Sequence, residues 1–111
     1  MVHRRAAHLA LLLSLLGAPL FAQNRPTPIA ADARTGVIRH VEAFAVTVDG
    51  KAMQLAAGAQ VRDQQNLIIV PMSIPRNGAV ADYTLNAQGQ IFRVWLLTPA
   101  ETAQRKPKGG G

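Results

Sequence analysis

The sequence contains no cysteine. This absence excludes disulfide bonds, zinc sites built on thiolates and thiol nucleophiles. It also excludes a lipoprotein that is anchored through an acylated N-terminal cysteine. We therefore expect the chain to be released in soluble form once its leader has been removed.

Side chains for catalysis are also scarce. After residue 22 the chain has one histidine, His40, and one serine, Ser73. A hydrolase triad would have to join these two with an acid, without a nucleophile elbow or a glycine-rich oxyanion loop. The glycines inside the chain each stand at an expected strand break rather than in a phosphate-binding loop: Gly50, Gly58, Gly78 and Gly89. The sequence therefore predicts no enzyme and no cofactor.

Neither sign of charge dominates the segment that we expect to fold. The chain has 12 Lys and Arg against 6 Asp and Glu, a formal net charge of +6. Arg4 and Arg5 belong to the leader, and Arg105, Lys106 and Lys108 to the C-terminal tail. The nearly balanced remainder argues against a nucleic-acid partner. Attraction of the basic tail to anionic lipid or polysaccharide stays open as an alternative.

Residues 1–22 have the three-part pattern of a secretory signal peptide. His3, Arg4 and Arg5 precede an apolar run over residues 6–16, and small residues follow it. We predict cleavage after Ala22 and export to the periplasm or beyond, with no transmembrane segment afterwards. The alternative is an uncleaved membrane anchor, for which the run is shorter than the roughly 20 residues that span a bilayer.

The rest of the chain indicates a linker over residues 23–33, one all-β domain over 34–98 and a disordered basic tail over 99–111. Alternating apolar residues and turn signals predict strands over 36–42, 44–49, 51–55, 79–85 and 90–97, and Leu67–Val70 as a short buried strand. Asp49-Gly50 predicts a tight hairpin turn. Short strands at this spacing are typical of a small antiparallel barrel of five or six strands, either OB-like (oligonucleotide/oligosaccharide-binding) or SH3-like, after an N-terminal signal helix.

Two sets of residues are candidates for binding. His40, Met53 and Met72 are imidazole and thioether groups that suit a monovalent copper or silver ion, although methionines on the inner face of a strand more often fill the core. Tyr83, Arg93 and Trp95 could form a stacking and charged surface, although packing of the aromatic rings in the core is the simpler interpretation.

The strand-and-glycine patterns at residues 35–38, 45–50, 78–83 and 89–91 resemble small exported bacterial β-barrels of families without known function. More distantly they resemble the periplasmic copper and silver chaperones of the CusF type, which are OB barrels. The second resemblance implies a metal held by one histidine and two methionines spaced one residue apart, with a tryptophan over the ion. Here Met53 has no such paired methionine and Trp95 lies in the last strand, so no metal role is carried over.

We therefore expect a non-catalytic, exported binding or accessory module whose partner is an envelope protein or another envelope component. The alternative is a periplasmic carrier of copper or silver. The sequence does not specify an oligomeric state.

Overall fold

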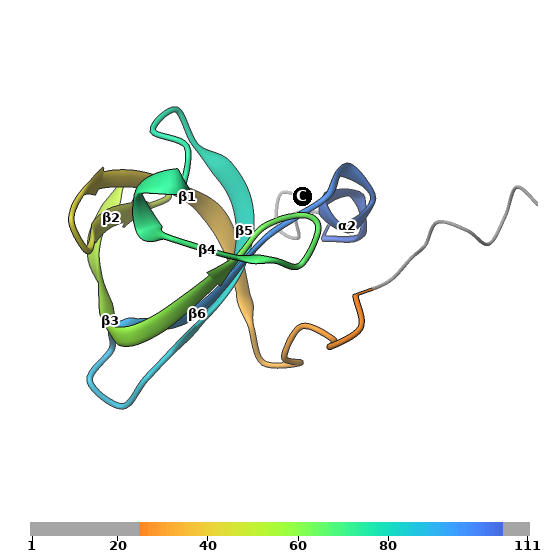
Figure 1. Ribbon diagram of the computed structural model, residues 1–111, viewed down its shortest axis with the longest axis horizontal. Coiled ribbons are helices and arrows are strands. Elements are labelled where there is room, and N and C mark those ends of the chain that lie inside the picture. The colour runs from red at the N-terminus through yellow and green to blue at the C-terminus, as the bar shows by residue number, and fades with distance from the viewer. Residues whose placement is uncertain (1–24, 106–111) are drawn as a thin grey trace, which may run out of the picture.

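The computed structural model describes residues 25–105 of the chain (Figure 1). Its strands are β1 (Arg34–Glu42), β2 (Ala45–Val48), β3 (Lys51–Arg62), β4 (Ile68–Ile69), β5 (Ala79–Leu85) and β6 (Ile91–Leu96). A 3-10 turn, η2 (Pro71–Ser73), follows β4, and a short helix, α2 (Pro99–Gln104), follows β6. The predicted signal helix and the cleavage site after Ala22 lie outside the described residues.

The strands form one mixed sheet in the order β2–β1–β5–β6–β3–β4, and β2 pairs in addition with β3. The predicted β-rich class is confirmed. The prediction of a wholly antiparallel sheet is wrong at one pairing, because β3 and β6 run parallel. The reason is topological: β5 pairs with β1 on one side, so β6, its hairpin partner on the other side, meets β3 in the same direction.

The turn between β2 and β3 confirms the prediction made from Asp49-Gly50. Val48 pairs with Lys51 across a two-residue connection, and Asp49 and Gly50 have positive φ angles of 53° and 85°. Positive φ at both central residues defines a type I′ turn, which favours Asp-Gly because glycine has no side chain to clash in this conformation.

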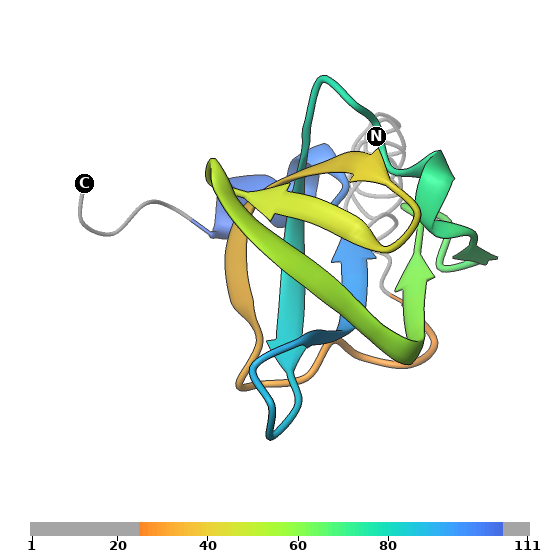
Figure 2. The same ribbon diagram turned by 90° about the vertical axis from the view of Figure 1, so that its left-hand side faces the viewer.

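β3 is longer than predicted, because it continues through the Ala57-Gly58 pair where we expected a break. Its first residues pair with β2, and its last residues pair with β6 and β4. The pairing with β6 is irregular between Leu55 and Gln60, and Gly58 lies inside this interval. A bulge of this kind bends a strand, and Figure 2 shows β3 crossing β5 and β6 diagonally.

The hydrophobic core is formed by the inward faces of β1, β2, β3, β5 and β6, together with Ile74, which follows η2 and is 1% exposed. Simple alternation fails along β6. Leu85 pairs with Ile91 and Thr84 with Arg93, which leaves Phe92 without a partner on β5. Because of this extra residue, Ile91 and Val94 both point into the core, although their spacing predicts opposite faces.

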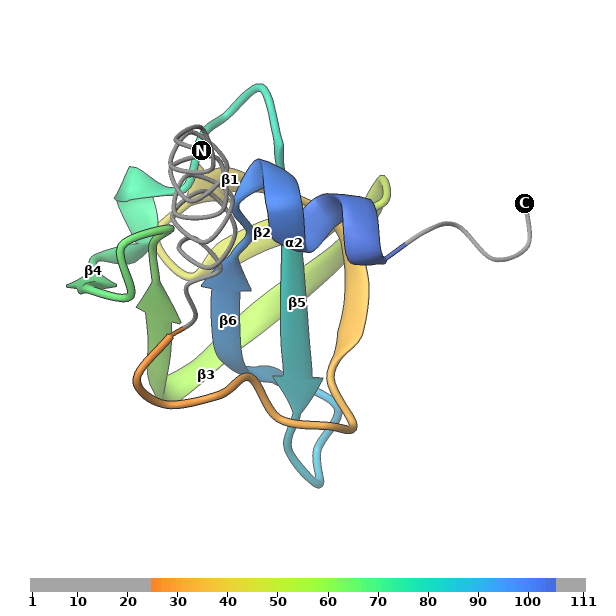
Figure 3. The same ribbon diagram turned by 90° about the vertical axis from the view of Figure 1, so that its right-hand side faces the viewer.

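The disordered tail predicted from residue 99 is wrong for residues 99–104, which form α2. Thr98 and Glu101 make a capping box: the Thr98 hydroxyl accepts the Glu101 backbone N–H, and the Glu101 carboxylate accepts the Thr98 backbone N–H. Pro99 fits the first helical turn because its missing N–H needs no partner there. Figure 3 shows α2 in front of β5. Residues 106–111 of the predicted tail lie outside the described part.

The run Leu67–Val70 is not the buried strand that we predicted. Leu67, Ile68 and Val70 are 63%, 56% and 57% exposed, and only Ile69 packs against the core. β4 stands at the end of the strand order and pairs only with the end of β3. Within residues 25–105 it therefore has a neighbouring strand on one side only.

Gly36 permits a close approach between β1 and the end of β2. A Cβ atom at this position would lie 2.8 Å from Asp49 Oδ2 and 2.9 Å from Val48 Cγ1. The same Asp49 carboxylate accepts the Val37 N–H at 2.8 Å. We expect Gly36→Ala to lower the free energy of unfolding by about 1–3 kcal/mol, because Asp49 and Val48 must shift.

Urea unfolding of the purified chain measures this difference. Ala52→Ser, which adds one atom at an exposed position of β3, is the control and should leave the midpoint nearly unchanged. Equal midpoints for the wild type and Gly36→Ala would contradict the steric argument.

Candidate functional site

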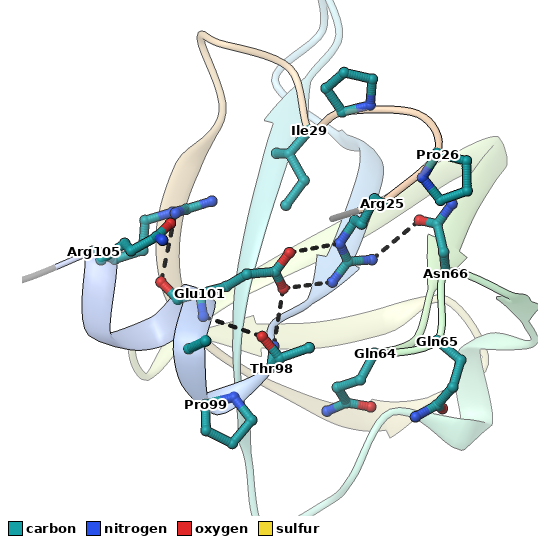
Figure 4. A pocket seen from close by; sticks show the side chains of 13 residues that line it. Arg25, Pro26, Ile29, Gln64, Gln65, Asn66, Thr98, Pro99, Glu101 and Arg105 are labelled. Carbon is teal, nitrogen blue, oxygen red and sulfur yellow. Dashed lines mark hydrogen bonds and ion pairs between the residues drawn. The ribbon is translucent and has the colours of Figure 1, made fainter. Parts of the chain in front are cut away.

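A surface pocket with a volume of 1090 Å³ lies between the segment that enters β1, the turn between β3 and β4, and α2 (Figure 4). Its walls include Pro26 and Ile29 on one side, residues 64–66 on the second and residues 98–101 on the third. These segments are far apart in the sequence, so the pocket depends on what connects them.

Arg25 connects these segments, and its side chain is only 5% exposed. Its Nε and one terminal nitrogen donate to the two carboxylate oxygens of Glu101 at 2.9 and 2.8 Å. The remaining N–H groups donate to the carbonyl oxygens of Asp63 and Leu96 and to Asn66 Oδ1. All five N–H donors of the guanidinium are thus satisfied by the protein. We call this group of five residues the Arg25 clasp.

The clasp also sets the electrostatics of the pocket. Hydrogen bonds from the Arg25 guanidinium hold the pKa of the Glu101 carboxyl below its ordinary value of 4.5, and the Thr98 backbone N–H adds to the effect. Partial burial of the carboxyl opposes this shift. Because the two charges neutralise each other at short range, the clasp holds the chain together rather than offering a free charge to a ligand.

A second ion pair fixes the end of α2. Arg105 donates to Asp82 Oδ2 at 2.7 Å, and the Thr35 hydroxyl donates to Asp82 Oδ1 at 2.6 Å. The Asp82 side chain is 4% exposed, and its hydrogen bond raises the pKa of the Arg105 guanidinium above the ordinary value. Arg105, which we predicted to lie in the disordered tail, is thus attached to β5.

The three predicted metal ligands lie on three different elements, β1, β3 and η2, and in different surroundings. His40 is 7% exposed, and its Nε2–H donates to the Ala43 carbonyl oxygen at 3.1 Å. Met53 packs against the core, and Val46 lies between it and His40 because Val46 pairs with both residues. Met72, on η2, is 74% exposed. In the described part of the chain, no group of three or more His, Asp or Glu side chains could hold a metal ion.

The predicted stacking residues do not share a surface either. Tyr83 belongs to the core. Trp95 is 8% exposed and pairs with Asp82 on the opposite face of the sheet, the face that carries the ion pair to Arg105. The Arg93 guanidinium lies 3.9 Å from the centre of the Phe92 ring, so its local partner is not one of the predicted aromatic groups.

The exposed surface that the prediction missed is apolar. Leu67, Ile68, Val70 and Met72 lie in the short segment that contains β4 and η2, and each is more than half exposed. We call these four residues the apolar strip. It begins directly after Asn66, which belongs to the Arg25 clasp. Large exposed apolar side chains are normal singly, but several of them in one short segment favour an interaction surface.

Part of this site was within reach of sequence reasoning. Thr98-Pro99 followed by Glu101 is a helix-start signal, and the apolar character of residues 67–70 was recognised, although not its exposure. Arg25 carried no comparable signal, because a single arginine in a proline-containing segment does not reveal a partner 76 positions away.

No family model, curated protein or solved structure matches the chain. Among the helices of the described residues, none has the length and apolar character that crossing a membrane requires.

We expect Arg25→Ala to lower the free energy of unfolding by about 2–4 kcal/mol, because it leaves a partly buried carboxylate and several acceptors without their donor. Arg25→Lys should lower it less, since it keeps the charge but loses the planar fork. Urea unfolding measures both. Arg34→Ala, at the exposed start of β1, is the control, and a loss as small as the control's would show that the clasp contributes little.

The lowered pKa of Glu101 predicts acid sensitivity. A carboxyl whose pKa is lower in the folded than in the unfolded chain stabilises the fold above its ordinary value of 4.5. This contribution is lost as the pH falls through the lowered pKa. We therefore expect the free energy of unfolding to fall from about pH 5 to about pH 3, and to fall less in Glu101→Gln. If the free energy of unfolding depended on pH in the same way in the wild type and in Glu101→Gln, Glu101 would not be the group responsible.

Proposed function

We propose that the protein is a non-catalytic, exported binding module that docks a partner in the cell envelope through the apolar strip. The leader pattern of residues 1–22 and the predicted cut after Ala22 support export to the periplasm or beyond. A protein partner is favoured because burial of these exposed apolar side chains against a second surface lowers the free energy, by roughly 25 cal/mol for each Å² that is buried.

The folded domain, in this proposal, is a closed five-stranded barrel of the OB-like type with β4 as a short appendage. The strand pairings support this. β1 pairs with β2, β2 with β3, β3 with β6, β6 with β5, and β5 with β1 again. Such a circuit gives each of these strands a neighbour on both sides, which removes open edges.

One observation carries the proposal: the strip includes and flanks β4, the only strand of the described sheet that has a single neighbour. The copper or silver carrier has no comparable support, because a backbone carbonyl engages His40 and Met53 packs against the core. A catalytic role has no comparable support either, since the His40 Nε2–H is hydrogen-bonded to the Ala43 carbonyl oxygen.

Photo-crosslinking in the cell envelope tests the docking role. With the photoreactive residue benzoylphenylalanine at position 68, we expect an adduct of higher mass than the protein alone, because Ile68 is 56% exposed on the docking surface. Gln88, exposed in the turn between β5 and β6, is the matched control position and should give no adduct.

A second variant makes the test specific. With the photoreactive residue at position 72, Ile68→Asp should remove the adduct, because a charge in the strip opposes burial. Absence of an adduct from both position 68 and position 72, or an adduct at position 72 that persists with Ile68→Asp, would overturn the proposed function.

A further inference from the structure

The apolar strip coincides with an open sheet edge. Every other strand of the described sheet has at least two neighbours, whereas β4 pairs only with β3. Figures 2 and 3 show β4 at the periphery of the molecule. An edge strand presents backbone N–H and C=O groups that can pair with another extended chain.

The backbone register shows which groups are free to pair. The Asp63 N–H donates to the Leu67 carbonyl oxygen at 2.9 Å, so Leu67 directs its carbonyl toward β3. In an antiparallel ladder successive residues direct their backbone groups to opposite sides. Ile69, paired with Val61, therefore also directs its backbone N–H and C=O toward β3. The backbone N–H and C=O of Ile68, between Leu67 and Ile69, face the open edge.

The loop that follows η2 is basic. Arg76 is exposed in the loop after η2, and the Arg39 guanidinium lies over Gly78 in the same loop, within 3.3 Å of the position of an added Cβ. Among the described residues, neither arginine has a carboxylate within ion-pair distance. At the other end, the Asp63 carboxylate accepts the backbone N–H groups of Gln65 and Leu67.

We infer, on the basis of the proposed function, that the β4 edge binds an extended, acidic segment of a partner protein as an added strand, with apolar side chains against the strip and a carboxylate near Arg76. A second copy of this chain fits less well, because residues 25–105 carry two more basic than acidic side chains, and it would bring like charges together. A lipid surface fits less well because it would leave the backbone groups of Ile68 unsatisfied.

Titration of the isotope-labelled, exported chain with defined peptides tests this inference. The probes are eight-residue peptides with blocked ends: alternating Val and Glu, alternating Val and Lys, and the Val-Glu peptide with alternate backbone nitrogens methylated. We expect the Val-Glu peptide to shift the amide resonance of Ile68, and the Val-Lys and methylated peptides to bind at least about threefold more weakly.

Two substitutions test whether the charge of Arg76 contributes to peptide binding at the β4 edge. Arg76→Gln should weaken binding of the Val-Glu peptide roughly threefold, as expected for one exposed ion pair. Lys51→Gln removes an exposed charge next to the β2–β3 turn and should leave binding unchanged. Equal binding of the Val-Glu and Val-Lys peptides would overturn the inference.

Two further outcomes would also overturn it. Shifts at Ile68 that grow with protein concentration alone would assign the edge to a second copy, and shifts caused only by phosphatidylglycerol vesicles would assign the strip to a membrane. If envelope crosslinks form from position 68 while no peptide binds, strand addition is wrong and the docking function stands.

Discussion

The ion pair between Arg25 and Glu101 is the interaction on which the outer part of this structure depends. The Arg25 side chain is only 5% exposed. A guanidinium is stable in such a position only if its charge is neutralised and all its donors are hydrogen-bonded. Glu101 neutralises the charge, and the remaining donors reach the β3–β4 turn and the end of β6. The segment before β1, that turn and α2 therefore have to be in place together, although none of the three contributes a long strand.

With these segments in place, the outer face of β5 and β6 is covered. Asp82 and Trp95 lie on that face and are almost fully buried, and Arg105 attaches the end of α2 to Asp82. A buried carboxylate needs this compensation, since desolvation without a partner costs several kcal/mol. The covering leaves β4 as the place where both an apolar surface and a free backbone edge are exposed within the described residues.

Local patterns predicted the elements whose structure is decided locally. Ala79–Leu85 is β5 as predicted, and the Asp49-Gly50 turn follows from backbone preference. The errors arise where distant neighbours decide the outcome. Gly58 was interpreted as a break, yet it lies in a bulge because β3 changes partners there. The exposure of Ile68 depends on the absence of a second neighbouring strand in the described sheet, which no local pattern encodes. The role of Arg25 depends on a carboxylate near the other end of the domain.

The clasp and the strip are adjacent, and this adjacency affects binding. Asn66 accepts a hydrogen bond from Arg25, and Leu67, the next residue, donates its backbone N–H to the Asp63 carboxylate. The turn that leads into β4 is therefore held by side chains on both sides. A two-residue strand has little stability of its own, so this anchoring keeps the edge extended before a partner arrives. A pre-organised edge loses less conformational entropy on binding, while its shortness limits unwanted pairing with other chains.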